Sequence, residues 1–311
     1  MNDTALPRIA VLVAVYNGMR WLTQQVDSIF SQEAVDVTLY ISVDLSQDDS
    51  ARWCQQLAAK DSRVVLLPLG QRYGSATKNF FRLLQEVDFS SFHYVSFADQ
   101  DDIWHSDKLS RAVNVLDSQD YSGYSSNVTA WWGDQAQKQR LLNKAQPMRK
   151  LDYFFESGGP GCTYVMTQAL TTSIQQKLLQ LPELVEQLDF HDWFCYAYAR
   201  GKNIRWYIDH KPTMLYRQHA NNAVGVNRGI GPFITRAKHV LAGHAFQQTL
   251  VILQVIFHGR LDQAPLIVPK NRWQFFKLAF KTCHCRRRLR DQFYFFCLCL
   301  VIAIYGYRQP L

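Results

Sequence analysis

The sequence lacks the glycine-rich loops that bind phosphates in two large classes of nucleotide-binding protein. Neither a G-x-G-x-x-G turn nor a G-x-x-x-x-G-K-[ST] loop follows any of its short apolar runs. In both classes the glycines let backbone N–H groups approach the phosphates closely. Dinucleotide binding and P-loop hydrolysis are therefore not expected, and a diphosphate ligand would need a metal ion to neutralise its charge.

A disulfide framework and a membrane-spanning segment are also lacking. The seven cysteines are odd in number and irregularly spaced, which favours a reducing compartment. Cys283, Cys285, Cys297 and Cys299 cluster around His284, but C-x-C departs from the usual spacing of zinc ligands, so no zinc site is expected. The stretch 1–8 is polar and does not resemble a secretory signal.

Short apolar runs alternate with amphipathic segments through the amino-terminal half. The expected strands are Ile9–Val15, Val37–Val43, Val64–Leu69 and Tyr94–Ala98. The expected helices are Trp21–Ser31, Ala51–Lys60, Ala76–Val87 and Asp107–Leu116. Nearly continuous hydrophobic strands separated by helical crossovers are typical of a βαβ series with a buried, mainly parallel sheet. The pattern predicts an α/β fold.

Three carboxylates follow the fourth expected strand directly: Asp99, Asp101 and Asp102. Like charges so close raise each other's pKa unless a cation compensates them. Oxygen ligands at a strand end suit Mg²⁺ or Mn²⁺, although an acidic turn that caps the next helix is the competing interpretation. Because ligands bind beyond the carboxyl ends of parallel strands, Tyr16 and Asp44 are expected in the same crevice.

Four motifs carry a family resemblance. They are Ile9–Gly18 (IAVLVAVYNG), Ser42–Ser50 (SVDLSQDDS), Phe97–Trp104 (FADQDDIW) and Tyr216–Asn222 (YRQHANN). Their order and spacing resemble glycosyltransferase family 2, and the last two resemble its rhamnosyltransferase-like branch, which builds bacterial surface polysaccharides. The resemblance covers roughly residues 7–225. It implies the nucleotide-diphospho-sugar transferase (GT-A-like) fold and inverting transfer.

The resemblance implies roles for individual residues of the crevice. Ala14, Tyr16 and Asp44 would hold a uracil- or thymine-type base, with Asp99 on the ribose side. The usual Asp-Asp-Gly-Ser reads Val43-Asp44-Leu45-Ser46 here, which retains only the base-binding Asp. Lys78 and Asn79 would lie near the nucleotide, with a solvated helix end as the alternative. Asp101, with Asp99 nearby, would bind the metal. Asp102 would not contact the metal but would hold its ligands in position.

The carboxyl-terminal part of the resemblance implies a catalytic base and a loop around the transferred sugar. Asp192, in His191-Asp192-Trp193, would take the proton of an acceptor hydroxyl. Its place in the first turn of a helix favours the ionised form, and a simple helix cap is the alternative. His219 would assist the metal and the leaving diphosphate. The loop 158–163, read as a turn into a strand over Thr163–Met166, would face acceptor and sugar through Gly161 and Cys162, with His191 and Trp193. Packing is preferred to a nucleophilic role for Cys162.

The net charge of +8 is confined to one segment of the tail. Residues 270–290 hold eight Lys or Arg and no acid, whereas the remainder holds 26 basic and 26 acidic residues. Phe293–Tyr307 follows as an apolar run of fifteen residues, too short to span a bilayer comfortably. A helix lying on an anionic membrane surface is preferred. Nucleic-acid binding is not expected. The alternative is a helix that docks on the protein itself or on a second subunit, with Ile234–His258 as the bridge to the tail or as a dimer face.

Together these observations predict a catalytic domain over 1–228, with a nucleotide-binding half (7–118) and an acceptor half (119–228), and a helical extension over 229–311. The predicted enzyme is a metal-dependent glycosyltransferase at the cytoplasmic face of the inner membrane. It would take a dTDP- or UDP-sugar as donor and a lipid-linked saccharide as acceptor. A sugar nucleotidyltransferase and a non-catalytic, membrane-associated nucleotide-sugar-binding scaffold remain the alternatives.

Overall fold

The computed structural model describes residues 5–133, 138–219, 244–257, 269 and 271–306. Seven strands form the central sheet in the order β10-β6-β9-β4-β1-β2-β3. Their bounds are β1 Arg8–Val15, β2 Asp36–Val43, β3 Val64–Leu66, β4 Tyr94–Ala98, β6 Gly123–Ser126, β9 Val165–Thr167 and β10 Trp206–Asp209. Strands β3, β2, β1 and β4 run parallel, and β9 runs antiparallel between β4 and β6. The predicted mainly parallel α/β sheet is confirmed.

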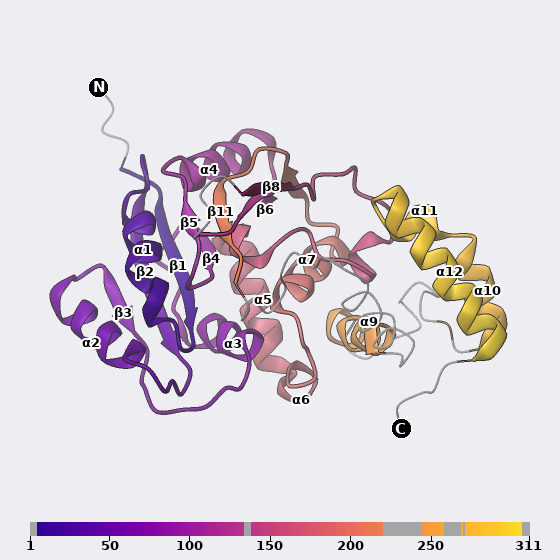
Figure 1. The fold of residues 1–311 in the computed structure, drawn as a ribbon, viewed down its shortest axis with the longest axis horizontal. Helices are drawn as coiled ribbons and strands as arrows, with labels where there is room; N and C mark the ends of the chain where they lie inside the picture. The colour runs from indigo at the N-terminus through magenta and orange to yellow at the C-terminus, as the bar shows by residue number, and fades with distance from the viewer. Residues whose placement is uncertain (1–4, 134–137, 220–243, 258–268, 270, 307–311) are drawn as a thin grey trace.

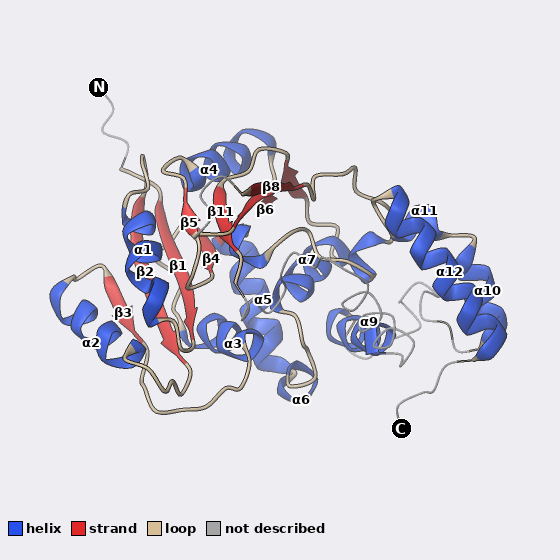
Figure 2. Cartoon of the chain, viewed as in Figure 1, coloured by secondary structure: helices blue, strands red, loops and turns tan. Residues whose placement is uncertain are grey.

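Helices cover both faces of this sheet because side chains alternate along its buried strands (Figures 1 and 2). Ile9, Val11 and Val13 of β1 pack with α1 (Met19–Phe30), α2 (Ser50–Lys60) and α4 (Lys108–Gln119). Ala10 and Leu12 point to the opposite face. There they pack with α3 (Ala76–Glu86), α5 (Gln168–Gln180) and α7 (His191–Gly201). The helices α3 and α7 therefore share one core.

The expected amino-terminal helices and strands are present, with differences at their ends. β3 stops at Leu66 rather than Leu69. The expected strand over Thr163–Met166 is wrong at its start, because Gly161–Thr163 forms a 3₁₀ turn (η2) and β9 begins at Val165. The Thr163 hydroxyl donates to the Pro160 carbonyl at 2.7 Å, which closes this turn.

A second sheet brings distant parts of the chain together. Its order is β5-β11-β7-β8, with bounds β5 Ile103–Trp104, β7 Val128–Trp131, β8 Gln139–Leu142 and β11 Met214–Arg217. β11 pairs antiparallel with β5, which directly follows the carboxylate cluster. This pairing places the residues after β11 beside Asp101, more than a hundred positions earlier in the chain.

The carboxyl-terminal helices are α9 (His244–Ile256), α10 (Arg272–Ala279), α11 (Thr282–Cys285) and α12 (Leu289–Tyr305). α9 lies against α7 and the short α6 (Pro182–Val185), and of the segment Ile234–His258 only this helix is among the described residues. α10 and α12 pack around a separate small core that includes Phe275 and Cys299, to one side of the central sheet (Figure 1). Within the described residues, no helix is both long and apolar enough to cross a membrane.

Candidate active site

The end of β1 is joined to the carboxylate cluster by two hydrogen bonds. The Tyr16 N–H donates to Gln100 Oε1 at 2.8 Å, and Gln100 Nε2 donates to the Tyr16 carbonyl at 2.9 Å. A Cβ at Gly18 would overlap the Gln100 amide, so a larger residue there would displace this side chain. The Tyr16 side chain is exposed beside this link, directly after β1.

Asp44 joins the turn that follows β2 to the loop that leads into α3. Asp44 Oδ1 accepts hydrogen bonds from the N–H groups of Leu45 and Tyr73, both at 2.8 Å, and Oδ2 accepts one from Gly74 at 2.8 Å. A carboxylate has about four acceptor positions, so one position on Oδ2 remains. This buried carboxylate can therefore still accept one N–H from a ligand.

The polar residues after Asp44 hold the start of α1. Ser50 Oγ accepts from the Gly18 N–H at 2.9 Å, and Asp48 Oδ2 accepts from the Met19 N–H at 3.0 Å. Asn17 adopts the left-handed conformation, with φ of 48°, and its side-chain oxygen accepts from Gln47. These bonds cap a helix that has no side-chain cap of its own, and they fix the turn at the end of β1.

Of the residues expected near the nucleotide, Asn79 has a different place. Its side-chain nitrogen donates to the Ser42 carbonyl at 3.0 Å and to the Val15 carbonyl at 3.4 Å. The side chain is buried, so it ties the ends of β1 and β2 from behind and does not line the crevice. Lys78 lies at the surface, paired with Glu186 at 2.5 Å. Ala14 is partly buried at the end of β1.

The structure brings Asp101 and His219 together. His219 Nε2 lies 2.7 Å from Asp101 Oδ2, and the imidazole ring stacks on Trp21 at 4.1 Å. The Arg217 Nε donates to the Asp101 carbonyl at 2.6 Å, and the Arg217 N–H donates to Asp102 Oδ1 at 3.0 Å. Arg217 is buried and thus holds the carboxylate loop in place instead of facing a ligand from the surface.

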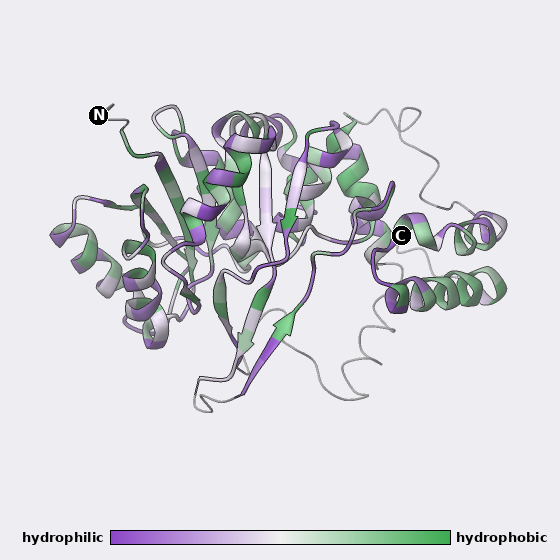
Figure 3. Cartoon of the chain, turned by 90° about the horizontal axis from the view of Figure 1, so that it is seen from above, coloured by the Kyte–Doolittle hydropathy of each residue, from purple (hydrophilic) through white to green (hydrophobic). Residues whose placement is uncertain are grey.

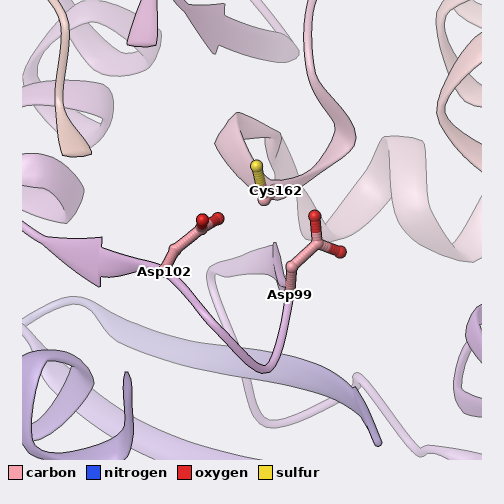
Figure 4. Close-up of side chains that lie close together, drawn as sticks. All are labelled: Asp99, Asp102 and Cys162. Carbon is pink, nitrogen blue, oxygen red and sulfur yellow. The ribbon is translucent and has the colours of Figure 1, made fainter. Parts of the chain in front are cut away.

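Asp99 and Asp102 converge on Cys162, as Figure 4 shows. One ligand atom from each lies within 4.8 Å of the others. Burial, followed by the charges of Asp101 and Asp192, raises the pKa of Asp99 to about 7. Burial, followed by the charges of Asp101 and Asp99, also raises the pKa of Asp102 far above its usual range. The Asp102 Oδ2 is buried and has no hydrogen-bond partner.

Two further buried groups face these carboxylates. Burial is the main cause that raises the pKa of the Cys162 thiol well above its usual range, so the sulfur is a neutral weak donor and not a nucleophile. The Lys108 ammonium is fully buried, 3.3 Å from Ser96 Oγ and 3.5 Å from the centre of the Trp104 ring. Burial lowers the Lys108 pKa to about 7, and the interactions with Cys162 and Asp102 partly offset this effect.

Asp192 lies in the first turn of α7 and faces the same region. Its Oδ1 accepts from the Trp193 N–H at 2.7 Å. Burial raises the Asp192 pKa to about 6, although Lys144 and Ser157 stabilise its charged form. Desolvation thus outweighs the stabilisation of the ionised form that the helix terminus was expected to provide, although Asp192 is still ionised above pH 6. A pKa near neutrality suits a general base.

The loop 158–163 packs directly on the start of α7. A Cβ at Gly161 would lie 2.8 Å from His191 Nε2 and 3.0 Å from the Asp192 Cβ, so only glycine allows this contact. His191 stacks on Phe80 at 4.1 Å, burial lowers its pKa to about 3, and its Nε2 has no partner. Trp193 differs from the expectation, since it is buried and its indole donates to the Tyr153 carbonyl at 2.8 Å.

Comparison with known proteins identifies the family. The model described as "Glycosyl transferase family 2" matches residues 10–171. The dTDP-rhamnosyl transferase RfbG of Shigella flexneri is 41% identical over 216 residues, which are 69% of this chain and 74% of that protein. This chain belongs to glycosyltransferase family 2. Family membership favours sugar transfer over the nucleotidyltransferase and scaffold alternatives.

Other relatives of this family 2 glycosyltransferase are more distant. The UDP-Glc:alpha-D-GlcNAc-diphosphoundecaprenol beta-1,3-glucosyltransferase WfaP of Escherichia coli is 26% identical over 120 residues, 37% of this chain and 45% of that protein. Among solved structures, the mannosyltransferase PcManGT of Pyrobaculum calidifontis, in complex with GDP-Man and Mn²⁺, has a TM-score of 0.53 at 14% identity. It covers 98% of this chain and 89% of that one. The TarS 1–349 fragment of S. aureus with UDP-GlcNAc gives 0.51 at 13% identity, covering 97% and 82%. These structures share the nucleotide-sugar transferase fold.

Proposed function

We propose that this family 2 glycosyltransferase moves a sugar, rhamnose in the first instance, from a dTDP- or UDP-linked donor to a hydroxyl of a lipid-linked saccharide during surface polysaccharide assembly. The transfer inverts the anomeric configuration and depends on a divalent metal. The similarity to the Shigella rhamnosyltransferase supports the donor sugar. The names of relatives that act on diphosphoundecaprenol-linked sugars support the acceptor class.

One observation carries the proposal: Asp192, whose pKa burial raises to about 6, and Asp101, which is paired with His219, both act on the carboxyl of Asp99. The charge of Asp192 contributes to the raised pKa of Asp99, so both carboxylates face one region. Asp99 itself neighbours the Asp101 side chain, which contacts His219. A direct displacement at a sugar carbon needs a base for the attacking hydroxyl and a group that stabilises the leaving diphosphate. Asp192 would be the base, and the carboxylate cluster with its metal would stabilise the diphosphate.

In this mechanism Asp192 removes the proton from the attacking acceptor hydroxyl. The hydroxyl oxygen bonds to the anomeric carbon as the bond from that carbon to the nucleotide diphosphate breaks on the opposite face, which inverts the configuration. Gly161 lets the loop 158–163 approach Asp192 closely, which leaves little room for competing water. The His191 Nε2, buried and without a partner, is suited to a hydrogen bond with a substrate hydroxyl.

The residues present fit a divalent metal. Asp99, Asp101 and Asp102 crowd negative charge into a buried loop, and the Asp102 Oδ2 is buried without a partner. Asp101 and His219, with Asp99 nearby, would hold the ion, because carboxylate oxygens and imidazole suit Mg²⁺ and Mn²⁺. When bound, the metal neutralises the charge of the departing diphosphate. Asp102, held by Arg217 and neighbouring Cys162, orients the loop.

The nucleotide end of the donor lies, in this proposal, between Tyr16 and the Asp44 loop. The remaining acceptor position on Asp44 Oδ2 would take the imide N–H of a thymine or uracil base, and the exposed Tyr16 ring would lie beside that base. Ala14 lines the floor. Lys78 stays outside this contact unless its ion pair with Glu186 opens.

The carboxyl-terminal helices would hold the enzyme at the cytoplasmic face of the inner membrane. Exposed aromatic and aliphatic side chains gather on α10, α12 and their connection, and they include Trp273, Phe280, Phe293 and Ile304. Figure 3 shows extended hydrophobic stretches on these helices. Basic residues of the same segment would contact anionic lipid headgroups. The proposed division is therefore a catalytic domain over 1–228 and a membrane-facing extension over 229–311.

A metal-dependence assay tests the function. Transfer from dTDP-rhamnose to a lipid extract is measured with Mn²⁺, with EDTA, and with EDTA followed by excess Mn²⁺; we expect transfer, loss and recovery, with an inverted product by NMR. The variant His219→Ala should need more metal, whereas His210→Ala, an exposed histidine, should not. Transfer that persists unchanged in EDTA would contradict the metal dependence.

A further inference from the structure

A group of basic side chains lies beside Asp192, whose charged form Lys144 stabilises. Two of them, Lys144 and Arg288, make no side-chain hydrogen bond or ion pair with any residue that the structure describes. Lys144 follows β8, and Arg288 is the residue before α12. The two come from distant parts of the sequence, yet the charge of Arg288 acts on Lys144, which indicates that they are neighbours.

Backbone contacts fix this arrangement. The Lys144 N–H donates to Asn127 Oδ1 at 2.6 Å, which anchors Lys144 at the end of β6. Arg286 Nη1 donates to the Phe155 carbonyl at 2.7 Å. Arg287 Nη2 donates to the Ser157 carbonyl at 2.6 Å. The basic segment 286–288 therefore packs on the residues that lead into the loop 158–163, and that loop contacts Asp192.

The nearby acids are already paired with other cations. Asp152 contacts Arg200 at 3.3 Å and Arg287 at 3.7 Å. Glu156 contacts Arg287 at 3.6 Å and Arg286 at 3.9 Å, and Asp291 contacts Arg290 at 3.3 Å. Burial, and then the charges of Arg288 and Arg287, lower the Lys144 pKa, and the charge of Glu156 partly opposes them. The cluster thus has a surplus of positive charge, which an anion would stabilise.

The position of the cluster indicates which anion. On one side lies Asp192, whose charged form Lys144 stabilises. On the other side lie the exposed apolar residues of the carboxyl-terminal helices, beginning with Leu289, which is 79% exposed directly after Arg288, and continuing with Phe293, 63% exposed. A ligand that joins a sugar hydroxyl, a phosphate group and a long apolar chain, in that order, matches this sequence of surfaces.

We propose that Lys144 and Arg288 bind the diphosphate of a polyprenyl-diphosphate-linked acceptor, with its lipid over α12 and its sugar at Asp192. This inference rests on the proposed function and adds to it the site that recognises the acceptor. Arg286 and Arg287 shape the site through their backbone contacts, and their charges are largely met by Glu156 and Asp152. Phosphate groups could also come from membrane lipids, and the experiment separates the two sources.

The test measures binding of farnesyl diphosphate to the full chain, with Mg²⁺ and excess dTDP present to occupy the donor site. Lys144→Gln and Arg288→Gln should each weaken binding about tenfold or more, because each removes a charge-assisted contact. Arg290→Gln is the matched control, since Arg290 is an exposed arginine paired with Asp291. Farnesol, which lacks the diphosphate, should bind wild type and variants alike.

Two results would overturn the inference. One is undiminished farnesyl diphosphate binding in both Lys144→Gln and Arg288→Gln. The other is a matching loss of binding to phosphatidylglycerol vesicles, which would assign the cations to lipid headgroups. Failure of the proposed function looks different: metal-dependent transfer would be absent while the charge-dependent binding of farnesyl diphosphate persisted.

Discussion

Replacement of Asp192 by asparagine should stabilise the fold while it removes the proposed catalytic base. Burial raises the Asp192 pKa from 3.8 to about 6. The carboxyl therefore ionises more easily in the unfolded state, and above pH 6 its ionised form destabilises the folded state. Each unit of pKa difference corresponds to about 1.4 kcal/mol. The penalty is therefore about 3 kcal/mol at pH 8, and asparagine removes it while its Oδ1 can still accept from the Trp193 N–H.

The sign of the pH dependence follows from the same values. A carboxylate whose folded pKa is raised costs nothing below the unfolded pKa, where it is neutral in both states, and its full cost appears above the folded pKa. The stabilisation by Asp192→Asn should thus fall from about 3 kcal/mol at pH 8 to about 1.5 kcal/mol at pH 5. Urea unfolding at the two pH values measures the difference.

A matched variant controls for the generic effect of the substitution. Asp120→Asn changes a side chain that is 98% exposed and has left-handed backbone, which asparagine accepts, so its free energy of unfolding should change by less than about 0.5 kcal/mol at either pH. A destabilised Asp192→Asn at pH 8, or a gain in stability that is independent of pH, would refute the assignment of a buried, destabilising carboxylate.

Three further variants test other parts of the account. Gly18→Ala should displace Gln100 and cost about 1–3 kcal/mol of unfolding free energy; Gln100→Ala should cost a similar amount and the double variant no more, whereas additive losses would argue against their contact. Lys108→Met should lower the free energy of unfolding in urea by about 3 kcal/mol, because it leaves buried carboxyls without their cation. A gain in stability would mean that Lys108 contributes only the cost of its own burial. Lys60→Met, at an exposed lysine, is the control. Phe293→Glu should weaken binding to anionic vesicles about tenfold in a flotation assay, and unchanged flotation would speak against a membrane-facing α12.

The carboxylate cluster could be predicted from the sequence because its cause is local. A fully buried strand, β4, ends at Ala98 and the acids follow immediately, so strand and crevice are visible in one segment. The pairing of Asp101 with His219 is not local: it depends on β11 lying against β5. Only the family resemblance suggested that contact, since a two-residue strand such as β5 leaves little hydrophobic pattern.

Burial is the part of the site that the sequence leaves open. Asn79 and Trp193 stand in the expected motifs, and their side chains bond to backbone carbonyls inside the core, which depends on which helices pack on them. The raised pKa of Asp192 has the same origin: a helix terminus contributes up to about 1 kcal/mol at the surface, less than the cost of burying the carboxylate. Gln100 and Lys108 had no distinguishing signal beyond their positions next to the motif.

The central claim is that Asp192 is the base of a transfer reaction whose donor is bound by other residues. The most direct measurement compares the rate of sugar transfer and the affinity for the nucleotide-sugar in wild type and Asp192→Asn. We predict that kcat falls about 10²- to 10⁴-fold, while the donor dissociation constant changes by less than about twofold, since Asp44 and the Asp101 cluster are intact. Transfer at the wild-type rate by Asp192→Asn would contradict the account.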